Sequence, residues 1–142
     1  MAIPIRILVL CTGNSCRSQM AEAFFRFYGK GRIDAYSAGL APKEVHPKAI
    51  QVMGEAGIDI SGHSSNHLSE YLNDRFDYVI TVCDNAAEQC PVFPGAATRQ
   101  HWPFDDPDKV TGTEGFVLNE FRRVRDEIRE KISDWVKITL PA

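Results

Sequence analysis

Short apolar runs and amphipathic segments alternate along this chain. The run at residues 5–10 is compact and rich in β-branched residues, which is typical of a strand buried on both faces of a parallel sheet. Further strands are predicted at 35–37, 77–82 and 99–102, the last of them closed by Pro103. The pattern therefore predicts four strands, of which the fourth is short.

Apolar residues between these strands recur at helical spacing. Ser18 opens one such segment after the first strand, and a second helix is predicted at 46–56, ending at Gly57. From Thr113 onward the apolar positions are three or four residues apart and the other face is charged, which predicts one long amphipathic helix whose buried side comprises Val117, Phe121, Val124, Ile128, Ile132 and Trp135.

Strands that alternate with helices predict right-handed βαβ units. We expect an α/β fold with three layers, α/β/α, around a central four-stranded parallel sheet. The 142 residues, 44% of them hydrophobic, fit one domain spanning 1–142. The segment 107–115 is predicted to be a surface loop.

The charge balance argues against a polyanionic partner. Sixteen Lys and Arg oppose nineteen Asp and Glu, a formal charge of -3, so no global field draws the chain to nucleic acid or to an anionic membrane. The apolar run near the N-terminus is too short to span a bilayer, and no signal-peptide cleavage pattern follows it. We expect a soluble, cytoplasmic protein in which any anion site is local.

Four cysteines, Cys11, Cys16, Cys83 and Cys90, are the first candidates for chemistry. They would suffice for two disulfides in a secreted protein, but a chain of this size without a signal favours reactive thiols. Ligands of parallel sheets sit beyond the carboxyl ends of the strands. Cys11, Cys83 and the pair Asp105–Asp106 each follow a predicted strand, so we expect them at one edge of the sheet.

The loop from Cys11 to Ser18, here called the anion loop, is suited to hold a tetrahedral oxyanion. A loop that enters a helix presents backbone N–H groups and the positive end of the helix dipole, and Arg17 adds a planar fork. The same field favours Cys11 as a thiolate nucleophile, with a further hydrogen bond from Ser18. The alternative is a buried strand-end thiol beside a surface arginine. The candidate oxyanion-binding residues are Thr12, Gly13, Asn14, Ser15, Cys16, Arg17 and Ser18.

These residues resemble the phosphate-binding loop of the low-molecular-weight protein tyrosine phosphatases and of the arsenate reductases that share their fold. The phosphatases usually continue the loop with Ser-Pro and follow an Asp-Pro with tyrosines, whereas here Ser18 precedes Gln19, and Asp106-Pro107 precedes Asp108. The chain is most similar to thioredoxin-linked arsenate reductases. The likeness covers nearly the whole chain, through CTGNSCRSQMAE, YSAG at 36–39, HPKAI at 46–50, TVC at 81–83, CP at 90–91, HWPFDDP at 101–107 and FRRVRDEI at 121–128.

The resemblance implies a reaction sequence. Cys11 forms a thiol-arsenate adduct, with Arg17 in the binding loop and Asp106 as proton donor. Cys83 then forms a disulfide with Cys11 and releases arsenite, and Cys90 takes over the disulfide with Cys83, which thioredoxin reduces. The implied role is arsenic detoxification by a monomer that needs no cofactor and accepts phosphate or sulfate as substrate analogues.

Two other functions stay open at this point. One is a low-molecular-weight protein tyrosine phosphatase or small-phosphoester phosphatase, because phosphate and arsenate have nearly the same shape and charge. The other is a non-enzymatic oxyanion-binding or thiol-sensing module, which would bind without turnover and have no need of Cys90.

The relay has a geometric requirement. If 85–90 is helical, Cys83 and Cys90 are separated by roughly 10 Å along the axis, beyond the ~7 Å Cα limit for a disulfide. Pro91 and Pro94-Gly95 follow as breakers. We therefore hypothesise that oxidation loops out residues 84–95.

Several residues receive weaker assignments. Cys16 is expected to pack, and zinc is disfavoured because cysteine pairs two to four residues apart are absent. The four histidines are interpreted as structural or surface groups. Some relatives hold potassium at positions matching Asn14, Glu22, Ser37 and Asn66. Asn66 replaces an Asp there and loses its charge, so we expect weak or absent potassium activation.

Overall fold

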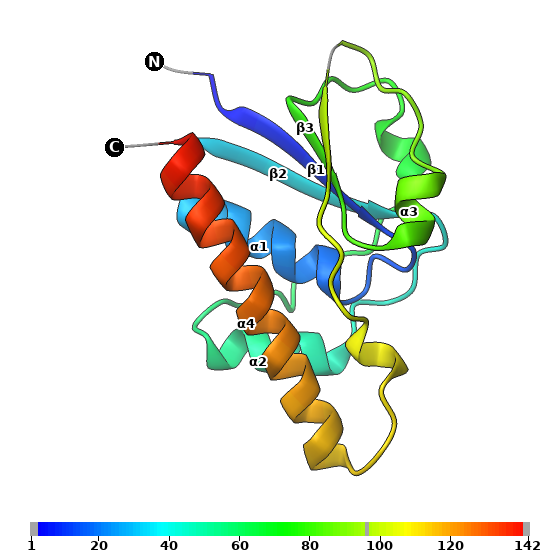
Figure 1. Ribbon diagram of the computed structural model, residues 1–142, viewed down its shortest axis with the longest axis vertical. Coiled ribbons are helices and arrows are strands. Elements are labelled where there is room, and N and C mark those ends of the chain that lie inside the picture. The colour runs from blue at the N-terminus through cyan, green and yellow to red at the C-terminus, as the bar shows by residue number, and fades with distance from the viewer. Residues whose placement is uncertain (1–2, 96, 141–142) are drawn as a thin grey trace.

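The computed structural model describes residues 3–95 and 97–140, so the outermost residues of the predicted domain lie outside it. The described elements follow the order β1 (Ile5–Cys11), α1 (Arg17–Gly29), β2 (Ile33–Gly39), α2 (Pro47–Glu55), η1 (Leu68–Tyr71), β3 (Tyr78–Thr81), α3 (Asp84–Glu88), β4 (Thr98–His101), η2 (Pro107–Lys109) and α4 (Glu114–Thr139). Within this part of the chain, the strands form one four-stranded parallel sheet in the order β2-β1-β3-β4 (Figure 1). The predicted sheet is confirmed.

The central strand β1 is buried on both faces because its side chains alternate between two hydrophobic clusters. Ile7 and Val9 pack in the larger cluster, with residues of α1, α2 and α4. Leu8 and Leu10 pack in the smaller cluster, which includes Phe76 and other residues of the connections around η1 and α3. The sheet is therefore the middle of three layers.

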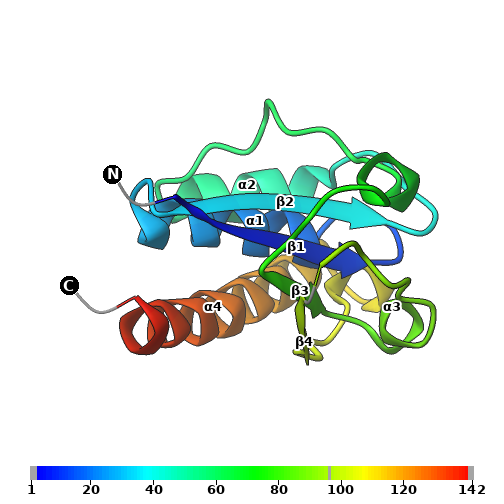
Figure 2. The same cartoon turned by 90° about the horizontal axis from the view of Figure 1, so that it is seen from above.

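The two covering layers are unequal. Figure 1 shows α1, α2 and α4 together on one side of the sheet. In Figure 2 the strands point away from the C-terminal end of α4 and towards the side of the molecule where α3 lies. The carboxyl ends of the strands therefore meet the anion loop and α3. None of the helices in the described ranges is both long and apolar enough to cross a membrane.

Several predicted boundaries differ from the observed ones. β2 covers Ile33–Gly39 rather than 35–37, because it pairs with β1 over seven residues. β4 covers Thr98–His101 rather than 99–102, and Trp102, whose N–H still donates to Thr81 O at 2.8 Å, is buried in the larger cluster. The prediction of a surface loop over 107–115 is wrong in part, because this segment begins with the turn η2, in which Pro107 is buried.

Candidate active site

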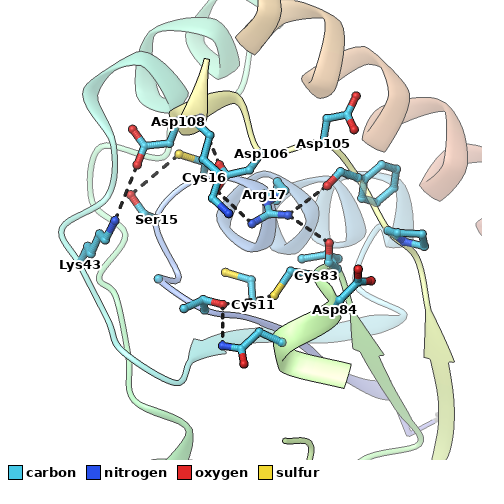
Figure 3. Close-up of a pocket in the computed structure, with 17 residues that line it drawn as sticks. Cys11, Ser15, Cys16, Arg17, Lys43, Cys83, Asp84, Asp105, Asp106 and Asp108 are labelled. Atoms are coloured by element: carbon cyan, nitrogen blue, oxygen red, sulfur yellow. Dashed lines mark hydrogen bonds and ion pairs between the residues drawn. The ribbon is translucent and has the colours of Figure 1, made fainter. Parts of the chain in front are cut away.

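The carboxyl ends of β1, β3 and β4 open into one pocket of about 690 Å³. Cys11 and Cys83 line it together with Arg17 and Asp106, as the sequence analysis expected (Figure 3). Asp105 lines it as well, whereas Cys90 is not among the lining residues. A nucleophile, a cation and a carboxyl group from separate parts of the sequence therefore share one cavity.

The anion loop is shaped by residues 40–46, here called the strap, which connect β2 to α2. Strap N–H groups donate to the carbonyls of Thr12 at 2.8 Å, Gly13 at 2.8 Å and Ser15 at 3.1 Å. In a trans peptide the N–H points opposite to the C=O, so the amides that follow these carbonyls turn inward. One of them, the N–H of Asn14, donates to Cys11 Sγ at 3.0 Å. The strap therefore orients the loop amides for an anion before any ligand is present.

A second hydrogen bond joins Cys11 to Ser18, a buried residue of α1. The Cys11 sulfur lies 2.9 Å from Ser18 Oγ, and that oxygen already accepts from Asn14 Nδ2 at 2.8 Å. A thiolate can only accept, so in the thiolate form of Cys11 the Ser18 hydroxyl is the donor of this hydrogen bond. With two donors, and with α1 starting beside it, the Cys11 sulfur is suited to carry a negative charge. Asn14, with φ of 48°, holds a left-handed conformation that asparagine tolerates.

The candidate oxyanion-binding residues fall into two groups. Thr12, Gly13, Ser15, Cys16 and Arg17 line the pocket. Asn14 and Ser18 are fully buried beneath Cys11 and hold its sulfur. The first group is placed to contact an anion, and the second is placed to activate the nucleophile.

Arg17 spans the pocket towards Asp106. Its Nη1 donates to the carbonyl oxygens of Phe104 at 3.0 Å and Val82 at 3.3 Å, and its Nη2 lies 3.4 Å from Asp106 Oδ2. The other carboxylate oxygen of Asp106 accepts from the N–H of Asp108 at 3.1 Å. Both groups are therefore held over the cavity that contains Cys11 (Figure 3).

Cys83 caps the start of α3. Its sulfur accepts from the N–H of Ala86 at 3.4 Å and lies 3.4 Å from Thr12 Oγ1, so it is held against the anion loop. Cys90 follows the end of α3 and packs partly buried against the smaller cluster. Burial raises the pKa of the Cys90 thiol, an effect that Arg99 partly offsets. All four cysteines are free thiols.

Cys16 has a different environment from Cys11. Its side chain is 4% exposed and packs in the larger cluster. Burial raises the pKa of its thiol to about 12, although its hydrogen bond to Ser15 Oγ partly opposes this rise. Cys16 at neutral pH is therefore a packed thiol, as its sequence interpretation expected.

The residues that match the potassium position are connected to one another by hydrogen bonds. Asn14 donates to Ser37 at 2.9 Å, and Ser37 donates to Glu22 at 2.8 Å. Asn14 Oδ1 already accepts from the N–H of Asn66 at 2.8 Å, and Glu22 is 3.2 Å from the guanidinium of Arg26. The Asn66 side chain bonds within its own turn. A backbone N–H and a guanidinium thus already take up part of the acceptor capacity of these oxygens, so weak or absent potassium activation stays the prediction.

Sequence reasoning assigned no functional role to Lys43 and Asp108, which line the pocket, or to His46, which contacts Asp108. Asp108 Oδ1 lies 3.1 Å from His46 Nε2, and its Oδ2 lies 3.8 Å from Lys43 Nζ. These contacts join the strap to the loop that carries Asp106. No periodicity signals them, because Asp108 is distant in sequence from both partners.

Comparison with known proteins adds a family. The model of the low molecular weight phosphotyrosine protein phosphatases matches residues 6–140. An arsenate reductase of Halalkalibacterium halodurans is 46% identical over 131 residues, 92% of this chain and 94% of that protein. The arsenate reductase of Bacillus subtilis is 42% identical over the same shares of the two chains.

Solved structures show the same relationship. An arsenate reductase in the oxidized state superposes with a TM-score of 0.78 at 33% identity, over 94% of this chain and 97% of that one. An arsenate reductase in the phosphate binding state gives 0.75 at 35% identity, over 94% and 98%. Wzb of Vibrio vulnificus, in complex with benzylphosphonate, shares the fold with a TM-score of 0.78 at 23% identity, over 94% and 98%.

Proposed function

The chain belongs to the low molecular weight phosphotyrosine protein phosphatase family, among its arsenate reductases, and we propose that it reduces arsenate through three of its cysteines. The observation that carries the proposal is the meeting of Cys11 and Cys83 in one anion-binding pocket. Phosphate ester hydrolysis needs one nucleophilic thiol, whereas reduction of arsenate needs two electrons. Two thiols that become a disulfide supply them.

The first step is nucleophilic attack of the Cys11 thiolate on arsenic. An S–As bond replaces one As–O bond while Arg17 and the inward N–H groups of the anion loop hold the remaining oxygens. Asp106 protonates the departing oxygen, which leaves as water. The proposal is supported by the reach of Arg17 and Asp106 across the same cavity.

The second step moves the electrons. Cys83 attacks the sulfur of Cys11, and the electron pair of the S–As bond stays on arsenic, which leaves as arsenite. Arsenic gains two electrons, and the two thiols lose them as the Cys11–Cys83 disulfide forms. The contact of Cys83 with Thr12 supports this step, because it keeps the second sulfur at the wall of the anion loop.

The third step restores Cys11. Cys90 attacks Cys83, the Cys11 thiolate leaves, and a Cys83–Cys90 disulfide remains for an external dithiol protein, which we propose is thioredoxin. The helix α3 lies between the two cysteines and must open for them to meet. The partial burial of Cys90 is a second reason for α3 to open, because burial raises the pKa of the Cys90 thiol and so disfavours the thiolate that must attack.

The relay also suggests a setting. Four free thiols and a disulfide that must be reduced in every cycle suit a reducing compartment, so we propose a cytoplasmic protein that acts in arsenic detoxification. Phosphate or sulfate should occupy the pocket as a competitor of arsenate, since all are tetrahedral oxyanions.

The test is mass spectrometry of cysteine variants after a single addition of arsenate. Cys90→Ala should release one arsenite per chain and accumulate the Cys11–Cys83 disulfide. Cys83→Ala should release no arsenite, because nothing attacks Cys11. Cys11→Ala should form neither adduct nor disulfide.

The same variants separate the alternatives. A phosphatase would hydrolyse an aryl phosphate but would release no arsenite and form no Cys11–Cys83 disulfide with arsenate, and a binding module would take up oxyanion with no turnover at all. Repeated arsenate turnover by Cys90→Ala, or the absence of any Cys11–Cys83 disulfide in it, would contradict the relay.

A further inference from the structure

A ring of contacts connects the anion loop to the loop of residues 103–109, here called the acid loop, which carries Asp106. The N–H of His46 donates to Ser15 O at 3.1 Å, and His46 Nε2 lies 3.1 Å from Asp108 Oδ1. The N–H of Asp108 donates to Asp106 Oδ1 at 3.1 Å, and Asp106 Oδ2 lies 3.4 Å from Arg17 Nη2. The series of contacts starts at Ser15 and finishes at Arg17, and both residues belong to the anion loop.

His46 is the rigid member of this ring. Its Nδ1 accepts from the N–H of Lys48 at 3.0 Å, capping α2, and its ring packs against Phe121 with 4.8 Å between centroids. Because Nδ1 accepts, the proton of the neutral imidazole is on Nε2 and faces Asp108. The hydrogen bond to Asp108 therefore exists without a charge on His46.

Lys43 is a weaker partner of Asp108. Its Nζ lies 3.8 Å from Asp108 Oδ2, and its side chain is 67% exposed, against 22% for His46. Exposed ion pairs of this kind contribute little. The hold on Asp108 therefore comes mainly from His46.

The two groups that contact the Asp106 carboxylate, the guanidinium of Arg17 and the N–H of Asp108, respond differently to a substrate. Arg17 is the cation that must turn its N–H groups to an incoming oxyanion, so the oxyanion competes with Asp106 for the guanidinium. The N–H of Asp108 faces Asp106 from within η2 and has no such competitor. Once substrate is bound, the orientation of Asp106 depends on Asp108.

We propose that Asp108, anchored by His46, is a positioning residue that keeps Asp106 aimed at the departing oxygen while Arg17 binds the oxyanion. The inference rests on the proposed function, in which Asp106 delivers the proton. The hydrogen bonds of Asp108 and His46 go to Asp106, Ser15 and Lys48 and to each other, not to Cys11. Their loss should therefore lower kcat and leave KM for arsenate nearly unchanged.

Steady-state kinetics of four variants test the proposal. Asp108→Ala and His46→Ala should each lower kcat about tenfold, a magnitude expected for a misplaced catalytic group. Asp108→Asn should retain most of the activity, because its amide oxygen still accepts from His46 Nε2. Glu114→Gln is the matched control. Glu114 lies 3.8 Å from Lys48, as Asp108 lies 3.8 Å from Lys43, but Glu114 is not among the residues that line the pocket. A wild-type kcat in His46→Ala would overturn the proposal.

A double mutant separates positioning from general destabilisation. In an Asp106→Asn background the group to be positioned is gone, so Asp108→Ala should cause no further loss of kcat. A second tenfold loss in that background would mean that Asp108 acts on the fold as a whole, and the proposal would fail.

Two readouts keep this inference separate from the proposed function. If the wild-type chain reduces no arsenate, the proposed function fails, but the same kcat pattern is still expected for hydrolysis of p-nitrophenyl phosphate, whose leaving oxygen needs the same proton. Hydrogen exchange at the Asp108 amide requires no substrate. His46→Ala should accelerate that exchange at least severalfold, and unchanged exchange would overturn the anchoring role of His46.

Discussion

Cys11 and Cys16 lie five residues apart in one loop, yet the fold gives their sulfurs opposite environments. Cys11 receives hydrogen bonds from Asn14 and Ser18 beside the start of α1. Cys16 turns into the hydrophobic core, where burial raises the pKa of its thiol. The loop therefore directs one sulfur to chemistry and the other to packing, through donor placement rather than residue type.

The raised pKa of Cys16 predicts a loss of stability in alkali. Its thiol ionises near pH 9.0 when exposed but near pH 12 in the folded protein, so the folded state favours the protonated form. This contribution is fully present below pH 9 and is lost as pH rises towards 12. The free energy of unfolding of the wild type, measured relative to Cys16→Ala by denaturant titration, should fall between pH 8 and pH 11. A difference that stays constant with pH would contradict the prediction.

The environment of Glu22 predicts that potassium has no specific effect. Arg26 and the hydroxyl of Ser37 already satisfy the carboxylate, and Asn66 supplies an N–H rather than a charged ligand. Replacing sodium by potassium at constant ionic strength should change kcat less than twofold, roughly the scale of nonspecific salt effects. Asn66→Asp, which adds a carboxylate, is the comparison variant. A strong potassium-specific increase in kcat of the wild-type chain would contradict the prediction, because it would mean that potassium displaces the contacts of Glu22.

At the scale of elements, two segments control the site. β2 ends at Gly39, where the chain passes so close to the anion loop that an added Cβ would lie 2.6 Å from Thr12 O and 3.0 Å from Asn14 N. α3 is only five residues long and begins at Asp84, directly after Cys83. The first segment holds the anion loop rigidly, and the second is short enough to open, because a single helical turn has little stability of its own.

Gly39→Ala should therefore damage both activity and stability. The obstructing atoms belong to the backbone, which cannot rotate away, and overpacking of this kind costs about 1–3 kcal/mol. The control is Gly54→Ala in α2, where a Cβ meets open space and should stabilise the helix by roughly 0.5–1 kcal/mol. Thermal unfolding and arsenate turnover of the two variants check this. Full activity in Gly39→Ala would show that the loop tolerates displacement.

The shortness of α3 predicts its response to oxidation. Formation of a Cys83–Cys90 disulfide should loop out residues 84–95, since the two cysteines flank the helix and cannot meet while it is formed. Hydrogen exchange of the oxidised protein should show lost protection there and unchanged protection in α1. Cys83→Ala treated identically is the control. Unchanged protection over 84–95 in a protein with that disulfide would contradict the hypothesis.

At the scale of the whole molecule, the formal charge of -3 does not describe the site. Four aspartates line the pocket, Asp84, Asp105, Asp106 and Asp108, yet an anion site is built beneath them from oriented N–H groups and Arg17. Backbone dipoles act over a few ångströms, where they exceed the screened field of distant charges. The acidic rim also lacks the tyrosines expected of a phosphotyrosine phosphatase, which favours a small inorganic oxyanion.

The surface predicts a monomer. The large hydrophobic side chains that are exposed in the described ranges belong to separate segments and include Phe27 in α1, Val92 after α3, and Phe116 and Ile138 at opposite ends of α4. Individual exposed apolar side chains are normal on a monomer and do not by themselves indicate an interface. Sedimentation equilibrium of the reduced protein should give the mass of one chain at micromolar concentrations. A stable dimer would contradict this.

Sequence by itself determined the fold class and identified the anion loop as a candidate site. Hydrophobic periodicity identified the strands and the long helix, since burial on a parallel sheet leaves a local pattern in residues such as Ile7, Val9 and Phe121. Cys11 and Arg17 could be named as candidate catalytic residues because the loop is continuous in sequence, and their roles stay a prediction.

Only the tertiary structure decided how distant segments complete the site. The strap that turns the loop amides inward, the contact of Cys83 with Thr12, and the hold of His46 on Asp108 join residues far apart in the chain. Such contacts leave no periodic signal, because each depends on where packing of the helices on the sheet brings two loops together. The same packing brought Ser37 of β2 to Glu22 of α1 and turned Cys16 into the core, and so decided which polar groups remain available for chemistry.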